Sequence, residues 1–173
     1  MIRRLALSLS LSVLSACFSM GDPARLREAD ELATQEKWDE AIEAYQEHIQ
    51  ERLEVSDRPD WENPYFYLLT IGDVELKRGE PTKALQRYEE AEKQGVASSL
   101  VSDRYRAVAA WYEEHGNLDE AIKVLTTYRE RDSLIFDAML DRLARKLTQQ
   151  EATSSVRADT SPTVAPSPSE HPH

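Results

Sequence analysis

The chain has 173 residues, which is enough for one domain with its own hydrophobic core. Charged residues make up 31% of it and only five are glycines, a composition that favours a helical fold over a β-sandwich or a barrel. The formal charge is −11 and no basic stripe occurs, so nucleic acid is not expected as a partner.

The first twenty residues have the pattern of a targeting segment. Arg3 and Arg4 form a positive n-region, residues 5–14 are apolar, and two small residues precede Cys17. An apolar run of ten residues forms a helix of about 15 Å, half of the ~30 Å hydrocarbon core, so it is too short to span a membrane. Residues 1–16 are therefore predicted to be a signal peptide.

The sequence Leu14-Ser15-Ala16-Cys17 resembles the lipobox of bacterial lipoprotein signal peptides. In that family the cysteine sulfur receives a diacylglyceryl group, cleavage falls before the cysteine, and its new amino group is acylated. The resemblance implies a lipidated Cys17, and several acyl chains anchor a protein stably. Residues 17–21 are then the lipidated cysteine and a short tether. The alternative is an ordinary signal peptide with an incidental cysteine.

The residue after the cysteine bears on the destination of such a lipoprotein. It is Phe18 rather than aspartate. By resemblance to enterobacterial lipoproteins, this implies a lipid anchor in the outer membrane with the protein facing the periplasm.

Three stretches of the chain match one another: KWDEAIEAYQEHI from Lys37, EPTKALQRYEEAE from Glu80 and NLDEAIKVLTTYR from Asn117. Each has alanine at the fifth place, then a larger aliphatic residue, and a bulky residue three places further on. Gly79 and Gly116 directly precede two of the stretches and fit helix ends that need a positive φ. The stretches begin 43 and 37 residues apart.

This pattern resembles the tetratricopeptide repeat (TPR), a helix–turn–helix unit of about 34 residues. The first interval is longer, and its excess is assigned to residues 55–64, VSDRPDWENP, whose two prolines break a helix. The resemblance implies an all-α fold, a TPR-like α-α superhelix of about three helical hairpins plus a C-terminal capping helix. An irregular helical bundle of the same hairpins is the alternative.

Caps and apolar periodicity predict helices over 23–35, 39–54, 64–78, 81–94, 99–114 and 118–131. Asp22 is the expected N-cap of the first helix, with Pro23 at its first position. A seventh helix is predicted after Ser133 as the cap that ends the array. The helical domain is predicted to span residues 22–150, and residues 151–173, rich in Ser, Thr and Pro, to form a disordered tail.

The sequence contains no pattern typical of a catalytic, metal or cofactor site. His48 stands beside Glu47 on a helix and His115 beside a glycine at a helix end, without a partner set for catalysis. No glycine-rich nucleotide loop and no nucleophile elbow occurs. We therefore expect no enzyme, no cofactor and no metal.

In TPR arrays the first helix of each unit lines a concave groove. Carried over position by position, the resemblance implies a protein-binding groove lined by Leu26, Asp30, Phe66, Leu69, Asp73, Leu76, Lys77, Arg106, Ala110 and Glu113. An apolar centre with a charged rim suits an amphipathic helix or an extended peptide segment. The alternative is that neighbouring helices or the capping helix cover Phe66, Leu69 and Leu76.

These observations predict a membrane-anchored periplasmic TPR lipoprotein that acts as an adaptor or scaffold in cell-envelope assembly. Its expected partners are another envelope protein or peptide segment, and the membrane through lipidated Cys17. Two alternatives stay open: a self-assembling structural envelope lipoprotein, and a peptidoglycan-modifying enzyme.

Overall fold

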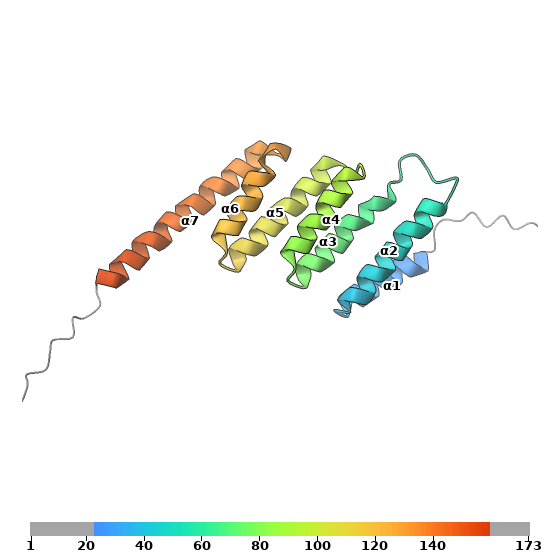
Figure 1. Cartoon of the computed structure of the whole chain (residues 1–173), viewed down its shortest axis with the longest axis horizontal. Coiled ribbons are helices and arrows are strands. Elements are labelled where there is room, and N and C mark those ends of the chain that lie inside the picture. The colour runs from blue at the N-terminus through green and yellow to red at the C-terminus, as the bar shows by residue number, and fades with distance from the viewer. Residues whose placement is uncertain (1–22, 160–173) are drawn as a thin grey trace, which may run out of the picture.

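The structure is a computed structural model that describes residues 23–159, with side chains from 24 to 152. The expected signal peptide, Cys17, the tether and Asp22 lie outside the described residues, as do residues 160–173. Figure 1 shows helices stacked side by side into an elongated array.

The chain folds into seven α-helices and two short 3-10 helices over the described residues. Five α-helices have the ends α1 Pro23–Thr34, α2 Trp38–Glu54, α4 Pro81–Lys93, α5 Ser98–Glu114 and α6 Leu118–Thr127. The 3-10 helix η1 Pro64–Phe66 leads into α3 Tyr67–Lys77, and η2 Arg129–Arg131 precedes α7 Ser133–Asp159. The predicted all-α fold and order of helices are confirmed, except that the sixth helix ends earlier and its last turn is replaced by η2.

The helices pair into three hairpins, α1–α2, α3–α4 and α5–α6, and each hairpin packs on the next element along the chain. Figure 1 shows the turns within the hairpins along one edge of the array and the longer connections between hairpins along the other. We call the second edge the loop edge. It contains residues 55–63, 94–97 and 128–132, the 3-10 helix η1, and the first turns of α1, α3, α5 and α7.

All three hairpins turn in the same way. The backbone N–H groups of Lys37, Glu80 and Asn117 donate to the carbonyl five residues earlier at 3.0, 2.8 and 2.8 Å, the bond that defines a Schellman helix end. This geometry needs a left-handed residue, and Gly79 and Gly116 supply it with φ of 87° and 78°, as predicted.

A glycine–tyrosine contact joins the two helices of the second hairpin. The ring of Tyr88 on α4 is fully buried against Gly72 on α3, and its hydroxyl donates to Asp73 Oδ1 at 2.8 Å. The first hairpin has a matching bond from Tyr45 to Asp30.

The third hairpin replaces both members of this bond. Ala110 stands where the others have aspartate, and Leu125 where they have tyrosine. The hairpins thus have either both the tyrosine and the aspartate or neither of them. The reason is that a buried hydroxyl needs a hydrogen-bond acceptor.

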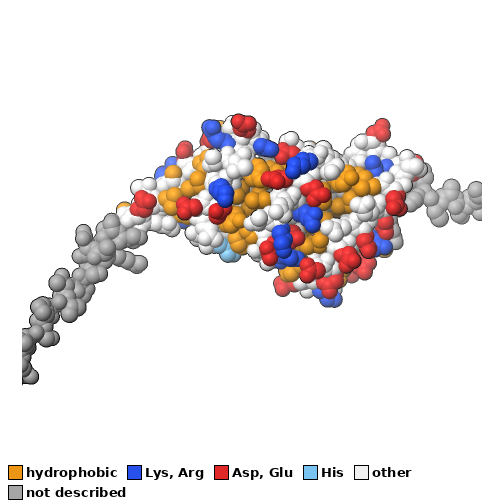
Figure 2. Space-filling model, viewed as in Figure 1, with side chains coloured by type: hydrophobic (Ala, Val, Ile, Leu, Met, Phe, Trp, Pro, Cys, Tyr) orange, Lys and Arg blue, Asp and Glu red, His pale blue; other side chains and the backbone are white. Residues whose placement is uncertain are grey.

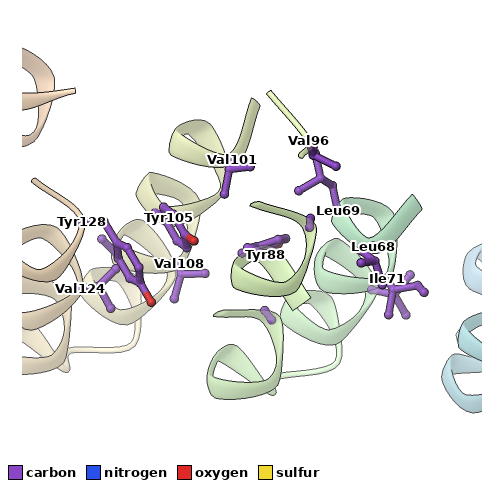
Figure 3. Close-up of a cluster of buried hydrophobic side chains, with 14 of the residues drawn as sticks. Leu68, Leu69, Ile71, Tyr88, Val96, Val101, Tyr105, Val108, Val124 and Tyr128 are labelled. Atoms are coloured by element: carbon purple, nitrogen blue, oxygen red, sulfur yellow. The ribbon is translucent and has the colours of Figure 1, made fainter. Parts of the chain in front are cut away.

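Aromatic rings continue this core between hairpins. Tyr88 meets Tyr105 edge-on with ring centroids 6.3 Å apart, and Tyr105 stacks on Tyr128 at 3.6 Å. Figure 3 shows the three rings between successive helices. Burial raises the pKa of each hydroxyl far above its usual range, so all three stay protonated.

Helix α7 covers the end of the array, as predicted for a capping helix. Phe136 and Leu143 are buried against the last hairpin, and Arg129 of η2 pairs with Asp137 of α7. The helix continues to Asp159 and so includes residues 151–159 of the segment predicted as tail. Within residues 23–159, no helix combines the length and the apolar content that crossing a bilayer requires.

Candidate protein-interaction surfaces

The leucines of the predicted groove belong to the core. Leu69 is fully buried, so its prediction as a groove-lining side chain is wrong. The reason is that α5 packs against α3 as well as α4 and covers this side of α3. Leu26 and Leu76 are partly buried and pack against the same core. The alternative of coverage by neighbouring helices therefore holds for Leu69 and in part for Leu76.

Two predicted groove aspartates bind side chains of their own chain. Asp30 accepts the hydroxyl of Tyr45. Asp73 accepts the hydroxyl of Tyr88 and also pairs with the guanidinium of Arg104 on α5, at 3.1 and 3.3 Å. These carboxylates hold helices together at the groove positions.

Glu113, the last of the predicted groove positions, lies against α7. Glu113 pairs with Arg142 at 2.5 Å and with Lys146 at 3.2 Å, and both basic residues come from α7. Arg106 pairs with Asp103 on its own helix. The capping helix therefore occupies the end of the predicted groove.

Three predicted groove residues make none of these polar contacts and are not packed against the core cluster. Phe66 is 42% exposed, Lys77 is exposed, and Ala110 is half-buried. Their role in binding stays a prediction.

A hollow that none of the predicted groove residues line lies between α2 and α4. We call it the α2–α4 cleft, and its volume is about 590 Å³. Its floor contains Ile49 and Leu68, both buried, and the half-buried Tyr65. Its rim carries five glutamates and two arginines: Glu43, Glu47, Glu51, Glu54, Glu90, Arg25 and Arg87.

The arginines neutralise only part of this rim. Arg25 pairs with Glu47 and Glu51, the latter at 2.7 Å, and Arg87 pairs with Glu90 at 3.1 Å. Neither Glu43 nor Glu54 has an ion pair among the described residues. The cleft therefore combines an apolar floor with an excess of negative charge.

Sequence reasoning missed this cleft, although a signal for it exists. Glu43, Glu47 and Glu51 recur at intervals of four residues, which places them on one face of α2. A solvated helix face has the same pattern, so the sequence alone does not distinguish the two.

On the view of Figure 2, basic and acidic side chains alternate with hydrophobic patches along the whole array.

A second hollow lies at the loop edge beside the exposed Trp61. It has a volume of about 520 Å³ and is lined by Trp61, Glu62, Asn63, Phe66, Tyr67, Gly95, Val96, Ala97 and Leu100. The predicted break at residues 55–64 is confirmed, because this segment forms no α-helix.

The loop that carries Trp61 is held by polar contacts. The guanidinium of the buried Arg52 donates twice to the carboxylate of Glu62, both at 2.6 Å, and these bonds lower the pKa of Glu62. Asn63 Nδ2 donates to the carbonyl of Gln94 at 3.0 Å and so joins this loop to the next one. Trp61 is therefore presented from a fixed segment.

Among residues 23–159, histidine and acidic side chains form no cluster that indicates catalysis. His48 is buried, with its ring edge-on to Tyr67 at 4.7 Å, and burial lowers its pKa. In the part of the chain between residues 23 and 159, no group of three or more His, Cys, Asp or Glu side chains could hold a metal ion.

Stacked antiparallel hairpins, closed by small–aromatic contacts and ended by a capping helix, define an α-helical repeat protein. Residues 69–134 match the family model described as "Tetratricopeptide repeat". The matched region begins in α3 and ends at the start of α7, so this part of the chain is similar to tetratricopeptide repeats. Repeats of this kind are typically non-catalytic modules that bind other proteins.

Two solved structures are similar to this chain, and the first of them supports the same fold. The TPR2AB domain of yeast Sti1 in complex with pHSP90 has 20% identity and a TM-score of 0.53, covering 76% of this chain and 49% of that one. PcrH in complex with the chaperone binding region of PopD has 17% identity and a TM-score of 0.40, covering 76% and 92%. This chain therefore spans about half the length of the Sti1 fragment. No curated protein sequence matches the chain.

Proposed function

We propose that the protein is a lipid-anchored interaction scaffold of a bacterial cell envelope, and that it holds a segment of a partner protein in the α2–α4 cleft. The observation that carries this proposal is the cleft itself, where the buried side chains of Ile49 and Leu68 form a floor between glutamate-rich walls. The repeat fold supports a protein partner, since the Sti1 complex holds pHSP90 on a similar array.

The chemistry of the cleft indicates the kind of segment that fits. Five glutamates face two arginines around an apolar floor, which favours a segment with lysine or arginine flanking an apolar side chain. Such a segment places its apolar side chain on the floor and its basic groups against Glu43 and Glu54.

The location rests on the sequence. The signal-peptide pattern and the lipobox resemblance at Cys17 support export and lipid attachment, and Phe18 supports the outer membrane with the domain facing the periplasm. An anchor of several acyl chains keeps the scaffold on the membrane and so recruits its partner there.

A pair of charge reversals tests the cleft. The double variant Glu43→Lys with Glu54→Lys removes two attractions to the basic groups of the segment and adds two repulsions. Each of these four changes is worth a few tenths of a kcal/mol at an exposed site, about 1.4 kcal/mol in total. This loss weakens binding about tenfold. The measurement is the yield of partner recovered from crosslinked membranes.

The matched control is Glu130→Lys with Asp141→Lys, which makes the same change of charge at exposed positions outside the cleft. Equal loss in both pairs would mean that net charge, and not the cleft, governs binding. The anchor is tested separately: Cys17→Ser should abolish incorporation of labelled palmitate, and continued labelling of that variant would refute lipid attachment at this residue.

A further inference from the structure

All the large hydrophobic side chains that are exposed among the described residues lie on the loop edge. They are Trp61, Phe66, Leu100, Leu134 and Ile135. Trp61 and Leu134 are 83% and 82% exposed, so neither contributes to the core. The opposite edge, at the turns within the hairpins, carries none of them.

Three of these side chains line the hollow beside Trp61, and the other two extend the row to α7. Trp61 and Phe66 lie at the start of the second hairpin, Leu100 is in the first turn of α5, and Leu134 and Ile135 are in the first turn of α7. In Figure 1 these helix starts follow one another along the same edge. A row that extends over successive repeats suits a broad, flat partner better than a single peptide.

The chain also enters the domain at this edge. Arg25, in the first turn of α1, pairs with Glu51 near the end of α2 at 2.7 Å, which places the start of α1 at the loop edge. Only five residues, 18–22, separate Cys17 from Pro23. At up to ~3.5 Å per residue they reach about 20 Å.

The opposite edge lies one helix length further from the start of α1 than the loop edge does. The 17 residues of α2 correspond to about 25 Å, more than the tether spans. A lipid on Cys17 therefore keeps the loop edge, and Trp61 in particular, next to the bilayer.

We infer that the loop edge is the membrane-contacting face of the protein, and that Trp61 with its neighbouring apolar side chains enters the lipid interface once the chain is anchored. The inference rests on the lipid anchor of the proposed function. Tryptophan suits this position, because its amphipathic ring prefers the boundary between acyl chains and headgroups.

The charges of the loop edge indicate the nature of the contact. Arg129 pairs with Asp137 and Arg131 with Glu92, while Asp57 and Asp60 belong to the same loop as Trp61. Basic groups are not in excess, so attraction to anionic lipid does not drive the contact. Apolar burial does, and it needs the anchor to bring the edge to the bilayer.

The test uses the chain from Cys17 onward, which contains every buried residue from Ala29 to Leu143. Its sole cysteine is coupled to a maleimide-bearing phospholipid in phosphatidylcholine vesicles that contain brominated acyl chains. The difference in fluorescence between wild type and Trp61→Phe isolates Trp61 without altering Trp38 or Trp111. We expect the emission of Trp61 to shift to shorter wavelength and to be quenched by the brominated lipid.

A control moves the anchor to the opposite edge. In Cys17→Ser with Lys37→Cys, the lipid is attached at the turn between α1 and α2, and the Trp61 component should stay as in water. Unquenched Trp61 with the anchor at Cys17, or equal quenching from both anchors, overturns the inference. So does protection of Trp61 that appears only with a crosslinked partner protein, since the edge is then a protein-docking site.

Because the lipid is attached chemically, this result does not depend on lipidation in cells. A chain labelled by palmitate whose Trp61 stays in water would refute the membrane-facing edge alone. A quenched Trp61 in a protein that takes up no palmitate through Cys17 would refute the anchor of the proposed function instead.

Discussion

Adding one methyl group at Gly72 should disrupt the second hairpin. A Cβ atom there would lie 2.2 Å from Tyr88 Cε1 and 2.7 Å from Cδ1, far inside van der Waals contact. The ring cannot easily move away, because its hydroxyl is bonded to Asp73 at 2.8 Å and its edge packs on Tyr105. Gly72→Ala therefore forces the two helices apart or breaks the Tyr88 contacts.

Two opposing terms set the magnitude. Overpacking of a buried site costs about 1–3 kcal/mol, and this overlap belongs at the upper end. The higher helix propensity of alanine relative to glycine stabilises the helix by about 1 kcal/mol. The net loss is about 2 kcal/mol, which lowers the Tm by about 4–8 °C for a domain of this size.

Thermal and urea unfolding followed by circular dichroism measure this loss, and a second substitution tests its cause. Tyr88→Leu should relieve the overlap, since the third hairpin already combines Ala109 with Leu125. The double variant should therefore lose less stability than the two single losses added together.

Gly79→Ala is the matched control. No atom lies within 4 Å of its added Cβ, so it should lose only about 1 kcal/mol from its positive φ, and Tyr88→Leu should not rescue it. A Gly72→Ala variant as stable as wild type, or more stable, would refute the proposed contact between the helices.

Two further substitutions test local features. Glu36 has φ of 59° where the other hairpins have glycine, so Glu36→Gly should raise the free energy of unfolding by about 1 kcal/mol, and a lower value in urea titrations would contradict this. Burial lowers the pKa of His48, so the unfolded chain binds a proton more readily than the folded one, and stability should fall as the pH drops below about 6.5. His48→Phe should flatten this dependence between about pH 7 and pH 5.5, and equal slopes in both proteins would refute the role of His48.

The positions of the helices follow from local features of the sequence. The apolar periodicity predicts each helix, and Pro81, Gly79 and Gly116 mark helix ends that the structure confirms. A helix is closed by bonds between residues four apart, so its limits depend mainly on nearby residues. Two helix ends differ most from the prediction: α6 ends at Thr127 rather than at residue 131, and α7 continues to Asp159, past the expected boundary.

The accessible surface was harder to predict. Leu69 occupies a groove position by its place in the repeat, yet α5 covers it. The α2–α4 cleft and the row of apolar side chains at the loop edge involve residues from different hairpins. Their neighbours in space are distant in sequence, so periodicity within one helix contains no information about them.

The sequence by itself thus determined the class of fold, the order of its helices and most of their limits, and the small residues and turn glycines that recur between hairpins. Only the tertiary structure decided which groove positions are buried, which glutamates gather around an apolar floor, and which edge carries the exposed tryptophan. The reason is physical: helix formation depends on local backbone bonding, whereas exposure depends on how whole hairpins stack against one another.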